Sequence, residues 1–192
     1  MSHATLFNEK RTAQAAAYLL HRGGGCLPLL KLMKLLYLAE RESLRVFGEP
    51  ITGDKPVSMP HGPVLSTTYD LMNGGLRSIE GGWDTWMDDR AGHDIALRDQ
   101  SMIRTPEQDL LELSDGDLEV LEAIWIRFGH MSKFQLVDYT HAGACPEWED
   151  PNGSSRPIPM ARLFRALGYS AKGESSAIEH LKEQTHLQSA FR

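Results

Sequence analysis

The chain has 192 residues, a net charge of −6 at pH 7 and a hydrophobic content of 41%. That length fits one large domain, and the hydrophobic fraction is enough for a core, which excludes a wholly disordered chain. No apolar run is long enough to span a membrane, and the first ten residues lack the pattern of a signal peptide. We therefore expect a cytoplasmic protein without a membrane partner. The only cysteines, Cys26 and Cys145, predict neither a disulfide framework nor a metal site.

The charge is unevenly distributed. Residues 1–48 contain seven Lys or Arg and three Asp or Glu, whereas the remainder contains 13 basic and 23 acidic residues. Such asymmetry is typical of a protein that meets a charged protein partner. It disfavours nucleic acid as the main target, so DNA binding is not expected.

A first helix is predicted from Asn8, a favourable N-cap, to about His21. The triple glycine at residues 23–25 ends it, because glycine adopts the left-handed conformation of helix caps readily. These glycines follow a helix, and no Gly-Lys-Ser/Thr comes after them. The pattern therefore does not predict a phosphate-binding loop.

A second helix is predicted from about Pro28 to Phe47, with an apolar face and a basic stripe on the opposite side. Two leucines border the stripe, and we expect them to be partly exposed, as at a contact surface. The alternative is that the stripe is an ordinary solvated face. The candidate partner-binding residues are Lys31, Lys34, Leu35, Leu38, Arg41 and Arg45.

Glu40 falls near the middle of the apolar face of this helix. A buried carboxylate requires hydrogen-bond donors or a positive partner. We hypothesise that Glu40 holds the turn at residues 60–64, through His61 or the backbone amides of the turn. His61 is also a candidate general base, although the sequence shows no nucleophile motif around it.

Residues 55–59 predict a short extended segment, and Pro56 favours a position at a sheet edge. The following Pro60-His-Gly-Pro63 predicts a rigid turn, with Pro63 opening a helix that runs to about Met72. Alternation around residues 95–97 predicts a strand, which we expect to pair with residues 56–59. Trp83 and Trp86 are predicted to cover the core, with a peptide-binding shelf as the alternative.

The second half of the chain is predicted to be helical. Ser114 and Asp117 form a capping-box pattern before a helix that ends at Gly129, and Ser132 caps another that runs to about His141. A short helix at residues 157–167 and a last one at about 174–188 follow. The fold class is mainly α (α+β): a compact bundle of about six or seven helices with a small antiparallel β element. We expect one domain over residues 1–156, with residues 157–192 as a helical extension packed on it.

Two runs of sequence together resemble a known family. Lys31-Leu-Met-Lys-Leu-Leu-Tyr-Leu-Ala-Glu40 and His61-Gly-Pro-Val64 are similar to the Panacea domain of SocA-like antitoxins and their phage-associated relatives. The resemblance extends over about residues 8–150. Its structural positions here are Tyr37, Glu40, His61, Gly62, Pro63 and Trp148.

The resemblance implies a helical domain that neutralises a protein toxin by direct binding, with no catalytic residues, metal or cofactor. A proteolytic adaptor that delivers a toxin to a bacterial protease is one alternative. An enzyme that uses His61 and Glu40 in an open pocket is another. A DNA-binding autorepressor is disfavoured by the pI of about 5.7 and by the lack of a basic recognition helix.

Overall fold

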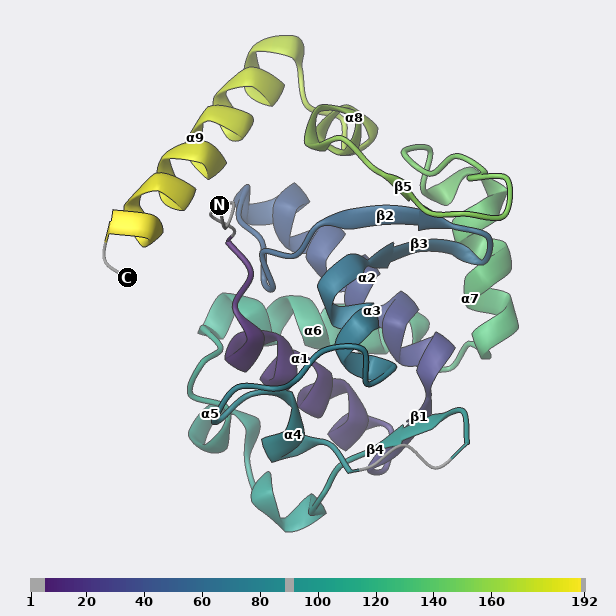
Figure 1. The fold of residues 1–192 in the computed structure, drawn as a ribbon, viewed down its shortest axis with the longest axis vertical. Coiled ribbons are helices and arrows are strands. Elements are labelled where there is room, and N and C mark those ends of the chain that lie inside the picture. Colours follow the sequence, from purple (N-terminus) through teal and green to yellow (C-terminus); the bar gives the residue numbers. More distant parts are fainter. Residues whose placement is uncertain (1–5, 89–91, 191–192) are drawn as a thin grey trace.

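Helix α2, Leu29–Phe47, lies at the centre of the fold (Figure 1). It contacts α1 (Glu9–Arg22), α6 (Asp115–Phe128) and α7 (Lys133–Tyr139), and it also packs on strand β3 (Gly62–Leu65). Because neighbours approach from several sides, 11 of its 19 residues are buried, including residues of its polar face. Residues 32–40 of this helix are buried on every face, so this part is not a half-exposed amphipathic helix.

The computed structural model describes residues 6–88 and 92–190. Within those residues the predicted fold class is confirmed: seven helices have seven or more residues, and two small antiparallel sheets accompany them. None of the described helices is long and apolar enough to cross a membrane. The remaining helices are α3 (Ser66–Met72), α4 (Trp83–Trp86), η1 (Gln100–Met102), α5 (Pro106–Asp109), η2 (Thr140–Ala144), α8 (Met160–Ala166) and α9 (Ala171–Ala190).

The predicted helix starts are confirmed by their caps. The Asn8 side chain accepts a hydrogen bond from the Arg11 backbone, and Ser114 and Ser132 each form a full capping box. These caps satisfy backbone N–H groups that have no partner inside the helix. Local side-chain chemistry therefore fixed where these helices begin.

The β structure differs from the prediction in three ways. Strand β2 (Pro56–Met59) is the central strand of a sheet ordered β3-β2-β5, with β5 at Arg156–Pro157, so the expected edge position is wrong. Strand β4 (Asp94–Ala96) pairs with β1 (Cys26–Pro28) and not with residues 56–59. The helix expected from Pro63 begins at Ser66 instead.

The helix begins later than predicted because a hairpin turn and strand β3 come before it. Pro60 and His61 connect β2 to β3 in register, with Met59 opposite Gly62. Gly62 has φ +97°, which favours glycine, and the turn sends the chain back along β2. Pro63 is tolerated because β3 is an edge strand, where a missing N–H costs little.

Two apolar clusters hold the chain together. The larger one contains most of the helical core, and Trp83 and Trp86 are buried in it, as the core prediction requires. The smaller one joins the end of α2 to the α8–α9 hairpin through Leu44, Ile158, Leu163, Phe164 and Leu181. Figure 1 shows α9 standing beside the body of the molecule, with α8 and the turn as its connection.

Candidate functional site: polar groups buried around helix α2

The predicted contact surface on α2 is largely inside the protein. Lys34, Leu35 and Leu38 have relative exposures of 0%, 0% and 4%, so the expectation that they are exposed is wrong. The cause is the central position of α2, which covers its basic stripe as well as its apolar face. Each buried cation therefore needs its own partner.

Lys34 finds its partner in the β2–β3 hairpin. Its Nζ donates a 2.9 Å hydrogen bond to the Pro63 carbonyl oxygen, and burial lowers its pKa to about 7. A Cβ at Gly62 would lie 2.7 Å from both Lys34 Nζ and Thr140 Oγ1. The absence of a side chain at Gly62 thus lets the amine approach the turn.

Glu40 is buried as predicted, but it holds a different segment. Its carboxylate accepts hydrogen bonds from the backbone N–H groups of Ile51, Thr52 and Gly53 and from Thr52 Oγ1, at 2.8–3.0 Å. The hypothesis that it holds the turn at residues 60–64 is wrong, because Lys34 does so. Burial raises the pKa of Glu40 to about 7. Glu40 fixes the loop that follows α2.

Asp54, which the sequence did not single out, does the same for α3. It accepts from the backbone N–H groups of Thr67 and Thr68 and from Thr68 Oγ1. The N-cap position of α3 is Leu65, which has no capping side chain, so Asp54 supplies that function from another segment. No local pattern indicates such a cap, because the residues are 13 and 14 positions apart.

Tyr37, Arg41 and Glu147 form a hydrogen-bonded group of polar side chains on another side of α2. Tyr37 Oη and Arg41 Nε donate to Glu147 Oε1 at 2.7 and 2.8 Å, and Glu147 has 0% exposure. The other oxygen, Glu147 Oε2, has no hydrogen-bond partner within the described residues. Burial lowers the pKa of Arg41, but the Glu147 carboxylate outweighs this and raises it overall. Sequence reasoning missed Glu147, since its partners are 106 and 110 positions away.

His61 and Glu40 do not meet. His61 is exposed at the tip of the hairpin, whereas every Glu40 oxygen is bonded to the loop after α2. The open pocket holding both side chains, which the enzyme hypothesis requires, is not present in the part of the chain that the structure describes. The hairpin end is held by Trp148, whose Nε1 donates to the Met59 carbonyl at 3.0 Å and whose ring stacks on His141.

Two cations of the predicted surface do reach solvent. Lys31 donates to the Gly129 carbonyl at 2.6 Å and lies over the Trp125 ring, 5.7 Å from its centroid. Arg45 is exposed and pairs with Glu42 one turn earlier on α2. The six candidates thus divide into Lys34, Leu35 and Leu38 in the core, Arg41 on Glu147, and Lys31 and Arg45 at the surface.

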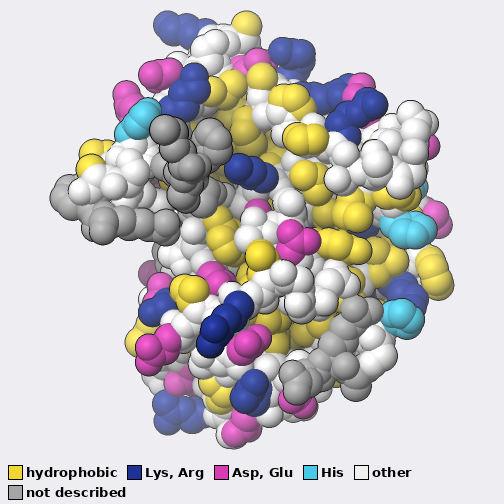
Figure 2. Space-filling model, in the orientation of Figure 1, with side chains coloured by type: hydrophobic (Ala, Val, Ile, Leu, Met, Phe, Trp, Pro, Cys, Tyr) yellow, Lys and Arg dark blue, Asp and Glu magenta, His cyan; other side chains and the backbone are white. Residues whose placement is uncertain are grey.

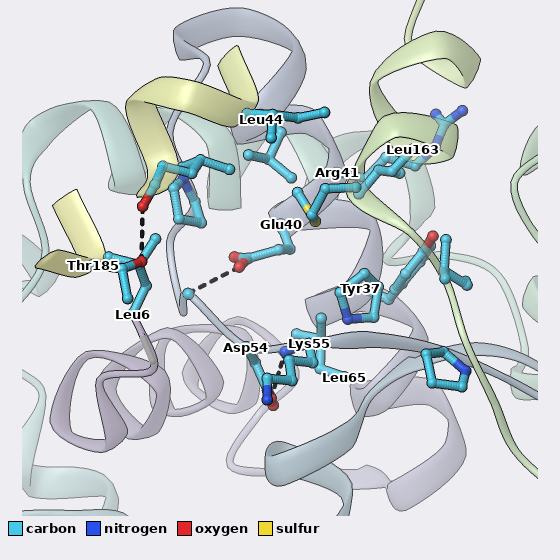
Figure 3. Close-up of a pocket in the computed structure, with 18 of the residues that line it drawn as sticks. Leu6, Tyr37, Glu40, Arg41, Leu44, Asp54, Lys55, Leu65, Leu163 and Thr185 are labelled. Carbon is cyan, nitrogen blue, oxygen red and sulfur yellow. Dashed lines mark hydrogen bonds between the residues drawn. The ribbon is translucent and has the colours of Figure 1, made fainter. Parts of the chain in front are cut away.

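A cavity of about 380 Å³ lies between α2, the segment after it and the α8–α9 hairpin. Figure 3 shows Tyr37, Glu40, Arg41 and Leu44 of α2 at the cavity, with Leu163 and Thr185 contributed by the hairpin. Figure 2 shows hydrophobic side chains in the hollow between α9 and the body. Over residues 6–88 and 92–190, no cluster of His, Cys, Asp or Glu has the arrangement of a metal site.

The sequence matches the model of one known protein family. The model of the family described as "Antitoxin SocA-like, Panacea domain" matches residues 32–149. The match covers more than half of the chain and includes Lys34, Glu40, Asp54, Gly62 and Glu147. The chain therefore belongs to the SocA-like antitoxin family. Searches of curated proteins and of solved structures return no match.

Proposed function

We propose that this protein is an antitoxin that neutralises a cognate protein toxin by binding it directly. The observation that carries the proposal is the family match over residues 32–149, which spans the whole buried polar network of α2. That network ties loops and helices to α2 through side chains with little exposure. It supports a rigid scaffold whose outer surface meets the partner.

The surface that we propose for toxin binding lies at the end of α6 and the start of α7, next to Lys31 of α2. We call it the basic–aromatic corner and define it as Lys31, Trp125, Arg127, Lys133 and Phe134. Phe134 is 65% exposed with Lys133 Nζ 5.3 Å from its ring centroid, and Lys31 lies over Trp125. Aromatic residues and arginine are enriched at protein interfaces, and the corner contains Trp125, Phe134 and Arg127.

The local charge of this corner indicates which kind of partner surface would fit it. Residues 123–137 contain Arg127, His130 and Lys133 and no Asp or Glu, although the whole chain is acidic. An acidic surface with an apolar centre would complement it, because opposite charge speeds encounter and fixes orientation. We therefore propose that the toxin presents acidic side chains around an apolar patch.

The experiment is coexpression with the protein encoded by the neighbouring gene. We expect that protein alone to arrest growth, coexpression to restore growth, and the pair to copurify from the lysate. An unchanged toxin level on immunoblots supports neutralisation by binding, whereas a falling level indicates delivery to a protease. Arrest that persists on coexpression, together with the absence of a complex, would overturn the proposal.

A further inference from the structure

The cavity beside α2 has walls from two parts of the chain. Leu44 and Leu65 come from the family-matched region, whereas Leu163, Ile178 and Leu181 come from the α8–α9 hairpin beyond it. Its volume of about 380 Å³ lies within the usual range for small-molecule sites. Helix α9 does not fill it, because Leu181 is its only buried residue within the described part of the helix.

The charged groups that line the cavity differ in what they can still bind. Both oxygens of Glu40 and both of Asp54 already accept two hydrogen bonds each from the protein. These carboxylates have little capacity left for a ligand donor. The cations are different, since Lys55 and Lys182 are exposed at the cavity wall.

Arg41 is the most specific of these cations. Within the described residues its guanidinium makes one hydrogen bond, from Nε to Glu147, although the group has five N–H donors. The side chain retains 19% exposure and lies on the cavity wall (Figure 3). The Glu147 contact holds the guanidinium in place, and its terminal N–H groups have no acceptor among residues 6–88 and 92–190.

We propose that this cavity binds an amphiphilic small molecule with an apolar body and a carboxylate head. The terminal nitrogens of Arg41 receive the carboxylate, in the geometry that arginine favours for planar acids. The apolar body lies along Leu44, Leu163 and Ile178. A bound molecule bridges α2 and α9 and so fastens the hairpin to the family domain, whatever the fate of the proposed toxin binding.

The test uses the full chain and decanoate below its micelle concentration, followed by calorimetry and thermal unfolding. We expect saturable binding and a rise of Tm with decanoate concentration, because a ligand of the folded state stabilises it. Decanol, which lacks the charge, is expected to bind at least ~10-fold more weakly, the equivalent of one charge-assisted hydrogen bond. Decylamine, which carries the opposite charge, should not displace bound decanoate.

Two variants of α9 locate the site without touching the Arg41–Glu147 pair. Ile178→Trp fills the cavity and is expected to abolish decanoate binding. Ser176→Trp places the same side chain at an exposed position of the same helix and should bind like the original chain. Decanoate binding that survives Ile178→Trp, equals that of decanol, or is absent altogether would overturn the proposal. Growth rescue does not enter the readout, so failure of the antitoxin function remains separate.

Discussion

At the scale of single residues, Lys34 makes stability depend on pH. Its pKa is about 7 in the folded protein and about 10.4 in an unfolded chain. Between these values the unfolded state binds more protons, so the contribution of Lys34 to stability increases with pH and is least favourable below about pH 7. The slope from one such group reaches ~1.4 kcal/mol per pH unit.

Lys34→Met should remove this slope. Urea unfolding of both chains between about pH 7 and about pH 8 measures it, in a window below the ordinary pKa values of thiols and phenols. We expect the free energy of unfolding of the original chain to gain about 1 kcal/mol on that of the variant over this window. Lys172→Met, at an exposed position of α9, should leave the slope unchanged. Equal slopes for the original chain and Lys34→Met would contradict the buried-amine assignment.

Gly62 is the second residue whose identity the structure explains. Gly62→Ala introduces a Cβ 2.7 Å from Lys34 Nζ and Thr140 Oγ1, at a backbone φ of +97°. Gly168→Ala is the matched control, because its φ is +86° and a Cβ there meets nothing within 4 Å. Both variants incur left-handed backbone strain, but Gly62→Ala should lose at least ~1 kcal/mol more in unfolding free energy from the steric contact. Equal losses would mean that Lys34 moves away without cost.

At the scale of elements, α2 and its following loop depend on Glu40. Glu40→Ala leaves four donors without an acceptor in a buried site, and we expect it to lower the unfolding free energy by ~3 kcal/mol or more. Glu40→Gln keeps the size but presents an amide donor to two of those groups, so its loss should be smaller yet clear. Urea denaturation measures both.

Glu42→Gln provides the control for these two variants, because it changes a partly exposed carboxylate two residues away on α2. Its partner is the exposed Arg45, and surface pairs contribute little. A loss for Glu42→Gln as large as that for Glu40→Gln would show that helix charge, and not the buried hydrogen bonds, determines the effect.

The same helix shows how far sequence reasoning reaches. The bounds of α2 and the burial of Glu40 followed from periodicity, caps and the cost of isolated charge. The burial of Lys34 did not follow, because a helical wheel places side chains relative to one axis and carries no information on how many neighbours surround that axis. The acceptors of the two inward-facing cations, Pro63 for Lys34 and Glu147 for Arg41, are distant in sequence, and nothing local marks them.

The few buried residues of α9 bear on where the domain of this chain ends. We propose that residues 157–192 are an extension of a domain that ends near residue 156. Only Leu181 of α9 is buried among the residues described, so truncation before Ala171 should leave a folded protein with an unfolding free energy lower by roughly 2–3 kcal/mol. Circular dichroism and urea unfolding check this. A truncated chain without cooperative unfolding would show that the hairpin is integral to the domain.

At the scale of the whole molecule, an exposed apolar side chain lies directly beside a cation at one place, Phe134 next to Lys133. Two of the four cations of the basic stripe predicted on α2, Lys34 and Arg41, bind Pro63 and Glu147 inside the fold. The cations that remain at the surface with aromatic neighbours lie at the basic–aromatic corner. Charge reversal of Lys31, Lys34 and Arg41 together would therefore disrupt the core and would not report on partner binding.

A surface test must leave the buried network intact. Lys133→Glu combined with Phe134→Asp changes two side chains of the corner, and Leu187→Asp on α9 is the matched control, since Phe134 and Leu187 are 65% and 60% exposed. If the toxin meets the corner, the double variant should bind it at least ~10-fold more weakly and fail to restore growth, because interface centres carry most of the binding energy. Its Tm should stay close to that of the original chain. Leu187→Asp should bind the toxin normally.

Full rescue of growth by the double variant would place the toxin elsewhere on the surface. Equal loss of binding in both variants would indicate a general effect of acidic substitution.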